Sequence, residues 1–246
     1  MSDGAQIKPV LVLQHVGCEP PGAYEDELLQ RRVPFARVRL DGREELPDWR
    51  AYGAIVAMGG AMGVDDEATH PWLAPEKRLI AEAVRAGTPY WGVCLGAQLL
   101  AASLGARVAP GPQPELGIGS VELTAAARDD PVFAAAPASF PTLHWHGDTY
   151  ELPPAAVQLA RSQMYEQQAF VVGRAYALQF HLEVGSALAG EWMRMPAFSD
   201  ELRELSGAGA PATLLEQLQS VEHESTTLAR ALFSRWLDVA GFSATA

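Results

Sequence analysis

Cys94 is the residue whose neighbours best suit covalent chemistry. It stands at the centre of Gly92-Val93-Cys94-Leu95-Gly96, a G-x-nucleophile-x-G pattern between an apolar run and a helical one. Flanking glycines permit a sharp turn from strand to helix, which lifts a nucleophile out of the sheet. A cysteine at a helix N-terminus lies at the positive end of the helix dipole, which favours the thiolate. The pattern predicts a Cys94 nucleophile, with the Leu95 N–H as one half of an oxyanion hole.

A cysteine nucleophile needs a base, and His181 is the best placed of the six histidines. It ends a predicted strand over residues 176–180, and Glu183 lies two residues farther on. If the extended geometry continues, both side chains leave the same face of the chain. A carboxylate beside an imidazole fixes its tautomer and stabilises the imidazolium. Cys94, His181 and Glu183 are therefore the predicted catalytic residues.

The first half of the chain alternates between strand and helix patterns. Such alternation indicates a parallel sheet covered by helices on both faces. The strand that leads into Cys94 is expected to be central. The expected strands span 9–14, 35–40, 54–58 and 89–93, and the expected helices span 23–33, 72–86 and 95–103.

From residue 107 to 180 the pattern changes to short strands between Pro- and Gly-rich turns, which favours antiparallel additions to the sheet. These strands are expected over 118–124, 142–145, 157–160, 169–172 and 176–180, followed by helices over 187–193, 212–219 and 222–239, with a linker-like segment at 206–211. No internal repeat or clear boundary divides the chain. We therefore predict a single domain over 1–246, with a catalytic core over about 8–195 and a C-terminal helical extension over about 196–246.

Two segments together carry a family resemblance. Gly92-Val93-Cys94-Leu95-Gly96-Ala97-Gln98, followed about 80 residues later by Gln179-Phe180-His181-Leu182-Glu183-Val184, resembles the class I glutamine amidotransferase family. That family hydrolyses the side-chain amide of glutamine with a Cys-His-Glu triad, through a γ-glutamyl thioester. His146-Gly147-Asp148 followed by Leu152-Pro153 is most similar to the stand-alone, GMP-synthase-like branch. The expected fold is α/β: a flavodoxin-like three-layer sandwich with a mostly parallel central sheet, antiparallel additions and helices on both faces.

The resemblance also implies roles for further residues. Gly60 would supply the second oxyanion N–H, Gln98 would lie against bound glutamine, and the other substrate contacts would come from Gly59, His144, Trp145 and His146. Leu182 stands where the family commonly has proline, which puts local rigidity in doubt rather than activity. His144 and His146 place two imidazoles on one strand face, but without an evident third ligand we expect no metal. The chemistry requires no cofactor.

The identity of the substrate stays open among three hypotheses. In the first, glutamine is hydrolysed and ammonia passes to an acceptor on a separate synthase or synthetase subunit. In the second, the protein acts alone as a γ-glutamyl peptidase or hydrolase on a γ-glutamyl-amine or γ-glutamyl-peptide conjugate. In the third, it is a non-enzymatic, flavodoxin-like redox sensor with Cys94 as its thiol. About 60 residues follow Val184 and contain no phosphate-binding loop, so the chain is not expected to adenylate a nucleotide itself.

The amino-acid composition and net charge limit the kinds of binding partner that are expected. The 246 residues carry a net charge of −12 and are 48% hydrophobic, which is typical of a folded domain and ill suited to nucleic acid or anionic membranes. Cys18 and Cys94 cannot form a disulfide framework, and Cys18, in the loop at 14–22, is expected to border an acceptor pocket. Residues 1–8 are polar and unlike a signal peptide, and no run approaches the roughly 20 apolar residues of a membrane span. A cytoplasmic location is expected, and the oligomeric state is not predicted.

Overall fold

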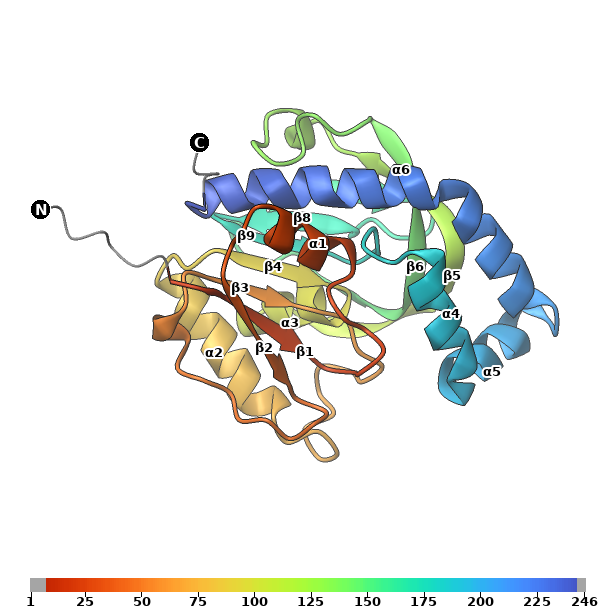
Figure 1. Ribbon diagram of the computed structural model, residues 1–246, viewed down its shortest axis with the longest axis horizontal. Helices are drawn as coiled ribbons and strands as arrows, with labels where there is room; N and C mark the ends of the chain where they lie inside the picture. The colour runs from red at the N-terminus through yellow and green to blue at the C-terminus, as the bar shows by residue number, and fades with distance from the viewer. Residues whose placement is uncertain (1–7, 243–246) are drawn as a thin grey trace, which may run out of the picture.

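The computed structural model describes residues 8–242, and its centre is a nine-stranded sheet (Figure 1). Five strands are parallel and follow the order β2-β1-β3-β4-β9, the 2-1-3-4-5 arrangement of flavodoxin-like folds. Four antiparallel strands extend the sheet in the order β8-β7-β5-β6. The strands are β1 (Val10–Gln14), β2 (Phe35–Arg39), β3 (Ala54–Ala57), β4 (Tyr90–Val93), β5 (Val108–Leu123), β6 (Ser139–Tyr150), β7 (Val157–Ser162), β8 (Ala169–Val172) and β9 (Ala175–Leu178).

Helices cover both faces of this sheet, as predicted. One face carries α1 (Ala23–Gln30) and α6 (Ala210–Val239), and the other carries α2 (Leu73–Arg85) and α3 (Leu95–Ser103) (Figure 1). Consecutive residues of β4 supply the two cores because side chains alternate along a strand. Trp91 packs with rings of α1 and α6, whereas Tyr90 belongs to the core beneath α2 and α3. The prediction of an α/β sandwich with β4 inside the sheet is confirmed.

The C-terminal region differs from its prediction. One helix, α6, replaces the two expected over 212–219 and 222–239, because nothing at 220–221 breaks a helix. A helix that was not predicted, α5 (Pro196–Ser206), follows α4 (Ser186–Arg194). The segment expected as a linker, 206–211, is only the turn between α5 and α6. These helices pack around Trp145 and Leu143 of β6, in a third hydrophobic cluster.

The hairpin of β5 and β6 is longer than the strands expected over 118–124 and 142–145. Its pairing runs from Val108 opposite Tyr150 to Glu122 opposite Ser139, with an irregularity between Pro110 and Glu115. Backbone pairing thus continues through residues that lack strand-like alternation. Two short 3₁₀ turns, Trp49–Ala51 and Ala126–Arg128, complete the elements. Across residues 8–242, none of the helices has the length and apolar character needed to span a bilayer, and most of the polar segment 1–8 lies outside this range.

Gly96 lets α3 start directly against β3. A Cβ atom at this position would overlap the carbonyl oxygen of Ala57 and approach its carbon to 2.7 Å. Because backbone atoms of a buried strand cannot move aside cheaply, we expect Gly96→Ala to lower the free energy of unfolding by about 1–3 kcal/mol. Urea unfolding would measure the loss.

Gly190 provides the matched control for this substitution. It lies within α4, and a Cβ there would meet nothing within 4 Å. Gly190→Ala is expected to be neutral or to stabilise the fold by about 0.5–1 kcal/mol through helix propensity. Equal unfolding free energies for the two variants would contradict the packing argument.

Candidate active site

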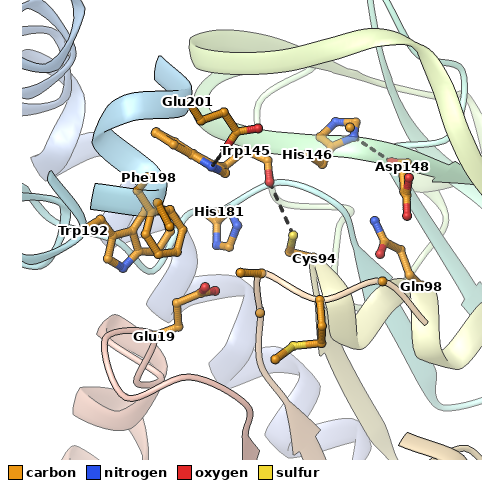
Figure 2. A pocket seen from close by; sticks show the side chains of 16 residues that line it. Glu19, Cys94, Gln98, Trp145, His146, Asp148, His181, Trp192, Phe198 and Glu201 are labelled. Atoms are coloured by element: carbon orange, nitrogen blue, oxygen red, sulfur yellow. Dashed lines mark hydrogen bonds between the residues drawn. The ribbon is translucent and has the colours of Figure 1, made fainter. Parts of the chain in front are cut away.

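Four parallel strands end at one edge of the sheet, and the residues that follow them meet there. Glu19 follows β1, Gly60 follows β3, Cys94 follows β4 and His181 follows β9. They line a cavity of about 240 Å³ that β6, α4 and α5 close from the side (Figure 2). Ligands of open α/β sheets bind at this carboxyl edge. The volume lies just below the roughly 300–1,000 Å³ of drug-sized sites, which suits a small metabolite.

Cys94 occupies the turn that its flanking glycines predicted. It is the N-cap of α3, with φ of 50° and ψ of −106°, a conformation that is strained for a residue other than glycine. Its N–H donates to the carbonyl of Leu178 at 2.8 Å, which anchors the turn to β9. The sulfur lies 3.6 Å from both the Trp145 carbonyl oxygen and Gln179 Nε2. The strained turn therefore presents the thiol to the cavity while the residue is only 6% exposed.

His181 and Glu183 form a buried pair beside Cys94. His181 Nδ1 lies 2.7 Å from Glu183 Oε1, and both side chains are 2% exposed. Strand β9 ends at Leu178, earlier than predicted, but a bridge between His181 and Leu143 of β6 keeps the chain paired to the sheet. Burial opposes a positive charge on His181, but the charge of Glu183 and hydrogen bonds to Cys94 and Glu183 raise its pKa well above the usual value. The pair thus favours a protonated imidazole facing the sulfur (Figure 2).

The loop after β3 brings a second backbone N–H near Cys94. Among the residues described, neither Gly60 nor Leu95 donates its N–H to a backbone acceptor, whereas the next N–H along α3, that of Gly96, donates to Met58. Behind the loop, His15 Nδ1 lies 3.1 Å from the Gly59 carbonyl oxygen and its Nε2 lies 2.8 Å from Glu76 Oε1. Burial disfavours the charge on His15, yet Glu76 outweighs burial and raises the His15 pKa. This buried pair supports the loop from below.

The other predicted substrate contacts divide into two groups. Gln98, Trp145 and His146 line the cavity together with Asp148. Gln98 is held by a hydrogen bond from its Nε2 to Gln179 Oε1. Gly59 and His144 lie behind the cavity wall, as do Leu95 and Glu183.

The two imidazoles of β6 have a third neighbour that sequence analysis missed. Glu115 of β5 places its Oε2 3.0 Å from His146 Nε2 and 3.3 Å from His144 Nδ1. The three side chains thus have the composition of a metal site, with their ligand atoms within 4.8 Å of one another. The same Glu115 oxygen accepts a 2.6 Å hydrogen bond from Gln168 Nε2. Glu115 is therefore the centre of a hydrogen-bonded cluster that fixes His146 at the cavity wall.

Comparison with known proteins gives the family. The model of the "Glutamine amidotransferase class-I" family matches residues 25–195. The chain belongs to the class I glutamine amidotransferase family. It is 35% identical over 170 residues to a GMP synthase [glutamine-hydrolyzing] of Thermomicrobium roseum, a match that covers 69% of this chain and 31% of the synthase. A putative glutamine amidotransferase-like protein, YfeJ, of Salmonella typhimurium is 30% identical over 174 residues, covering 69% of this chain and 73% of YfeJ.

A solved structure is similar over nearly the whole length. The crystal structure of a glutamine amidotransferase of Thermotoga maritima has a TM-score of 0.85 and 35% sequence identity, covering 94% of this chain and 98% of that one. The chain is therefore an enzyme of this family, and the redox-sensor hypothesis loses its support. It spans about a third of the length of the GMP synthase that it matches.

Among the charged and aromatic cavity residues of this amidotransferase, four were not singled out from the sequence. Their side chains line the cavity on the His181 side, and they are Glu19, Trp192, Phe198 and Glu201. Cys18, expected to border a pocket, does not line the cavity; its carbonyl oxygen accepts a 2.7 Å hydrogen bond from Trp192 Nε1. The only local signal was the position of Glu19 in the loop after β1, on the ligand-binding edge of the sheet.

Proposed function

We propose that this enzyme hydrolyses a γ-glutamyl amide through a thioester on Cys94. Glutamine is the parent substrate, and glutamate and ammonia are the products, with the ammonia available to an acceptor on a separate chain. The observation that carries the proposal is the alignment of Cys94, His181 and Glu183, with the 2.7 Å hydrogen bond of the last two. A positioned nucleophile, base and orienting carboxylate form the constellation that acyl transfer requires.

In the first half of the reaction the Cys94 thiolate attacks the γ-carbonyl carbon. The oxygen becomes an oxyanion, held by the N–H groups of Gly60 and Leu95, a contribution of roughly 3–4 kcal/mol per donor by analogy with other acyl transferases. The carbon–nitrogen bond then breaks while protonated His181 gives its proton to the leaving nitrogen. The amine departs, and the glutamyl group remains as a thioester on Cys94.

In the second half, water replaces the amine. Neutral His181 takes a proton from the water as its oxygen attacks the thioester carbon, and the carbon–sulfur bond then breaks. The γ-carboxylic acid that forms loses its remaining proton to solvent and leaves as glutamate, and Cys94 and His181 return to their starting ion pair. Glu183 stays ionised throughout and stabilises the imidazolium that forms in each half.

The α-amino and α-carboxylate ends of the substrate would lie on the side of Gln98, His146 and Asp148. These residues lie on the other side of Cys94 from His181 and Glu19 (Figure 2). Asp148 is the only carboxylate lining this end of the cavity among the residues described, and it matches the α-ammonium group. The α-carboxylate would bind the backbone of β6 near Trp145.

A second candidate function is stand-alone hydrolysis of a γ-glutamyl conjugate. It is favoured by the way α4 and α5 of this same chain wall the nitrogen side of the cavity with Trp192, Phe198 and Glu201. An enzyme that only delivers ammonia has no evident use for side chains there. Both candidate functions share the thioester chemistry.

The experiment is an assay of glutamate release by the purified protein alone. Glutamine and a series of γ-glutamyl amides would be supplied, and glutamate measured by a coupled dehydrogenase. Turnover that exceeds the glutamine rate for a conjugate supports the stand-alone function, and slow release from glutamine alone supports a subunit that awaits its synthase. Absence of glutamate release from every amide would refute the proposed chemistry.

A further inference from the structure

The nitrogen side of the cavity can be located from the chemistry. His181 must reach the leaving nitrogen to protonate it, so any group attached to that nitrogen extends past His181. Glu19 lies in that direction: a Cβ built on Gly59 would have Glu19 Oε2 as its nearest neighbour and His181 Cε1 3.2 Å away. The carboxylate and the imidazole are therefore neighbours at this end of the cavity (Figure 2).

Aromatic rings form the wall beyond His181. The rings of His181 and Trp192 meet edge to face with centroids 5.3 Å apart, and Phe198 stacks on Trp192 at 5.5 Å. Trp145 closes the set, 5.7 Å from Phe198, and its Nε1 donates a 3.3 Å hydrogen bond to Glu201 Oε2. Aromatic faces beside carboxylates are the surroundings that attract an organic cation.

If the substrate is glutamine, no positively charged group of the substrate lies near the carboxylates of Glu19 and Glu201. Its single positive charge is the α-ammonium group, which the proposed orientation places near Asp148, and its leaving group is neutral ammonia. Among the described residues, no lysine or arginine lines the cavity. The positive charge near Glu19 is that of His181, which is hydrogen-bonded to Glu183. A leaving group with a carboxylate, as in a γ-glutamyl peptide, would meet like charge on this side.

We propose that Glu19, Trp192, Phe198 and Glu201 form a subsite for the nitrogen-bearing part of the substrate, which takes an aliphatic amine with a second, positively charged amino group. The substrate class is then the γ-glutamyl amides of diamines or polyamines. This inference rests on the proposed γ-glutamyl hydrolysis and selects among its substrates.

The state of Glu19 agrees with this assignment. It is 5% exposed, and burial raises its pKa to about 7, although the charge of His181 opposes part of the rise. No hydrogen bond from the described residues stabilises its carboxylate. An incoming ammonium group would supply the missing partner, because a charge-assisted hydrogen bond favours the ionised form.

The test compares three substrates that share a four-carbon chain on the amide nitrogen and differ in the group at its far end. They are γ-glutamyl-1,4-diaminobutane, γ-glutamylbutylamine and γ-glutamyl-4-aminobutyrate, which are positive, neutral and negative there. We expect kcat/KM to fall in that order, with about a ten-fold step between the positive and neutral substrates, as one contact to a charged group predicts. Equal values, or a preference for the negative substrate, would overturn the subsite.

Variants then identify the residues that cause the preference for the positive substrate. In the variant Glu19→Gln, the ratio of kcat/KM for the positive substrate to kcat/KM for the neutral substrate should fall towards one. The ratio should fall further in the double variant that carries both Glu19→Gln and Glu201→Gln. Glu204→Gln is the matched control, since Glu204 is an exposed carboxylate of α5 outside the cavity, and it should keep the ratio of the parent enzyme. If Glu19→Gln lowers kcat/KM by the same factor for both substrates, Glu19 positions His181 and binds no amine.

A binding measurement separates this inference from the proposed reaction. Calorimetry on Cys94→Ala would compare γ-glutamyl-1,4-diaminobutane with γ-glutamylbutylamine, without any turnover. Tighter binding of the first, by about ten-fold, supports the subsite even if no amide is hydrolysed. Cys94-dependent hydrolysis with equal binding of both would leave the proposed function standing and reject the subsite.

Discussion

Replacement of Cys94 by alanine should lower glutamate release by about 10⁴-fold or more, to the level of the uncatalysed reaction with the substrate merely bound. The sulfur is the only atom that can form the proposed thioester, and neither the oxyanion donors nor His181 can replace it. Binding of the γ-glutamyl amide should persist, because the cavity walls are unchanged. Glutamate release and calorimetric binding of the amide would measure the two effects.

Cys18→Ala is the matched control for that variant. Burial raises the pKa of the Cys18 thiol to about 11, and its side chain does not line the cavity. Its contact with Trp192 uses the backbone carbonyl, which alanine retains. Full activity in Cys18→Ala and none in Cys94→Ala is the expected pair of results. Residual hydrolysis above a few per cent in the Cys94 variant would rule out the thioester.

Glu183→Gln should lower kcat by about 10²–10⁴-fold with a much smaller effect on KM. The amide would still fill the space beside His181, but it removes the negative charge that stabilises the imidazolium. The pKa of His181 should fall, because the charge of Glu183 is the leading cause of its rise. Stopped assays would measure kcat, and NMR of labelled histidine would follow the titration of His181.

Glu224→Gln, on the exposed face of α6, serves as the control for a lost carboxylate. It should change neither kcat nor the titration of His181. The Glu183 variant also tests the redox-sensor hypothesis, since a sensor thiol would still oxidise at an ordinary rate without the carboxylate. Unchanged kcat together with an unchanged His181 titration would remove Glu183 from the proposed mechanism.

Much of the central architecture was predictable because its signals are local. The turn at Cys94 depends on glycines within two residues, and helix 95–103 was predicted with the bounds that α3 has. The parallel strands followed from apolar runs that alternate with helices. Likewise, His181 and Glu183 are two residues apart, so their pairing required only extended backbone between them.

The C-terminal helices are the part of the fold that local sequence patterns predicted least well. Helix α5 offers few core positions, chiefly Phe198 and Leu202, and these pack in the third cluster with β6, α4 and α6 rather than in the two main cores. Its amphipathic pattern is clear, but its short apolar face was not singled out from the sequence. The packing of Phe198 beside Trp145 and Trp192, with the hydrogen bond from Trp145 to Glu201, places Glu201 at the cavity.

By itself, the sequence predicted the proposed nucleophile, its base and its orienting carboxylate, and it indicated the family, since each depends on residues close together in the chain. Tertiary structure alone decided what surrounds them. It brought Glu115 to the two histidines of β6, and it brought Glu19 and Glu201, 182 positions apart in sequence, to one side of a single cavity. The physical reason is that reactivity is set by a turn and a hydrogen bond, whereas specificity is set by side chains that meet only when distant elements pack.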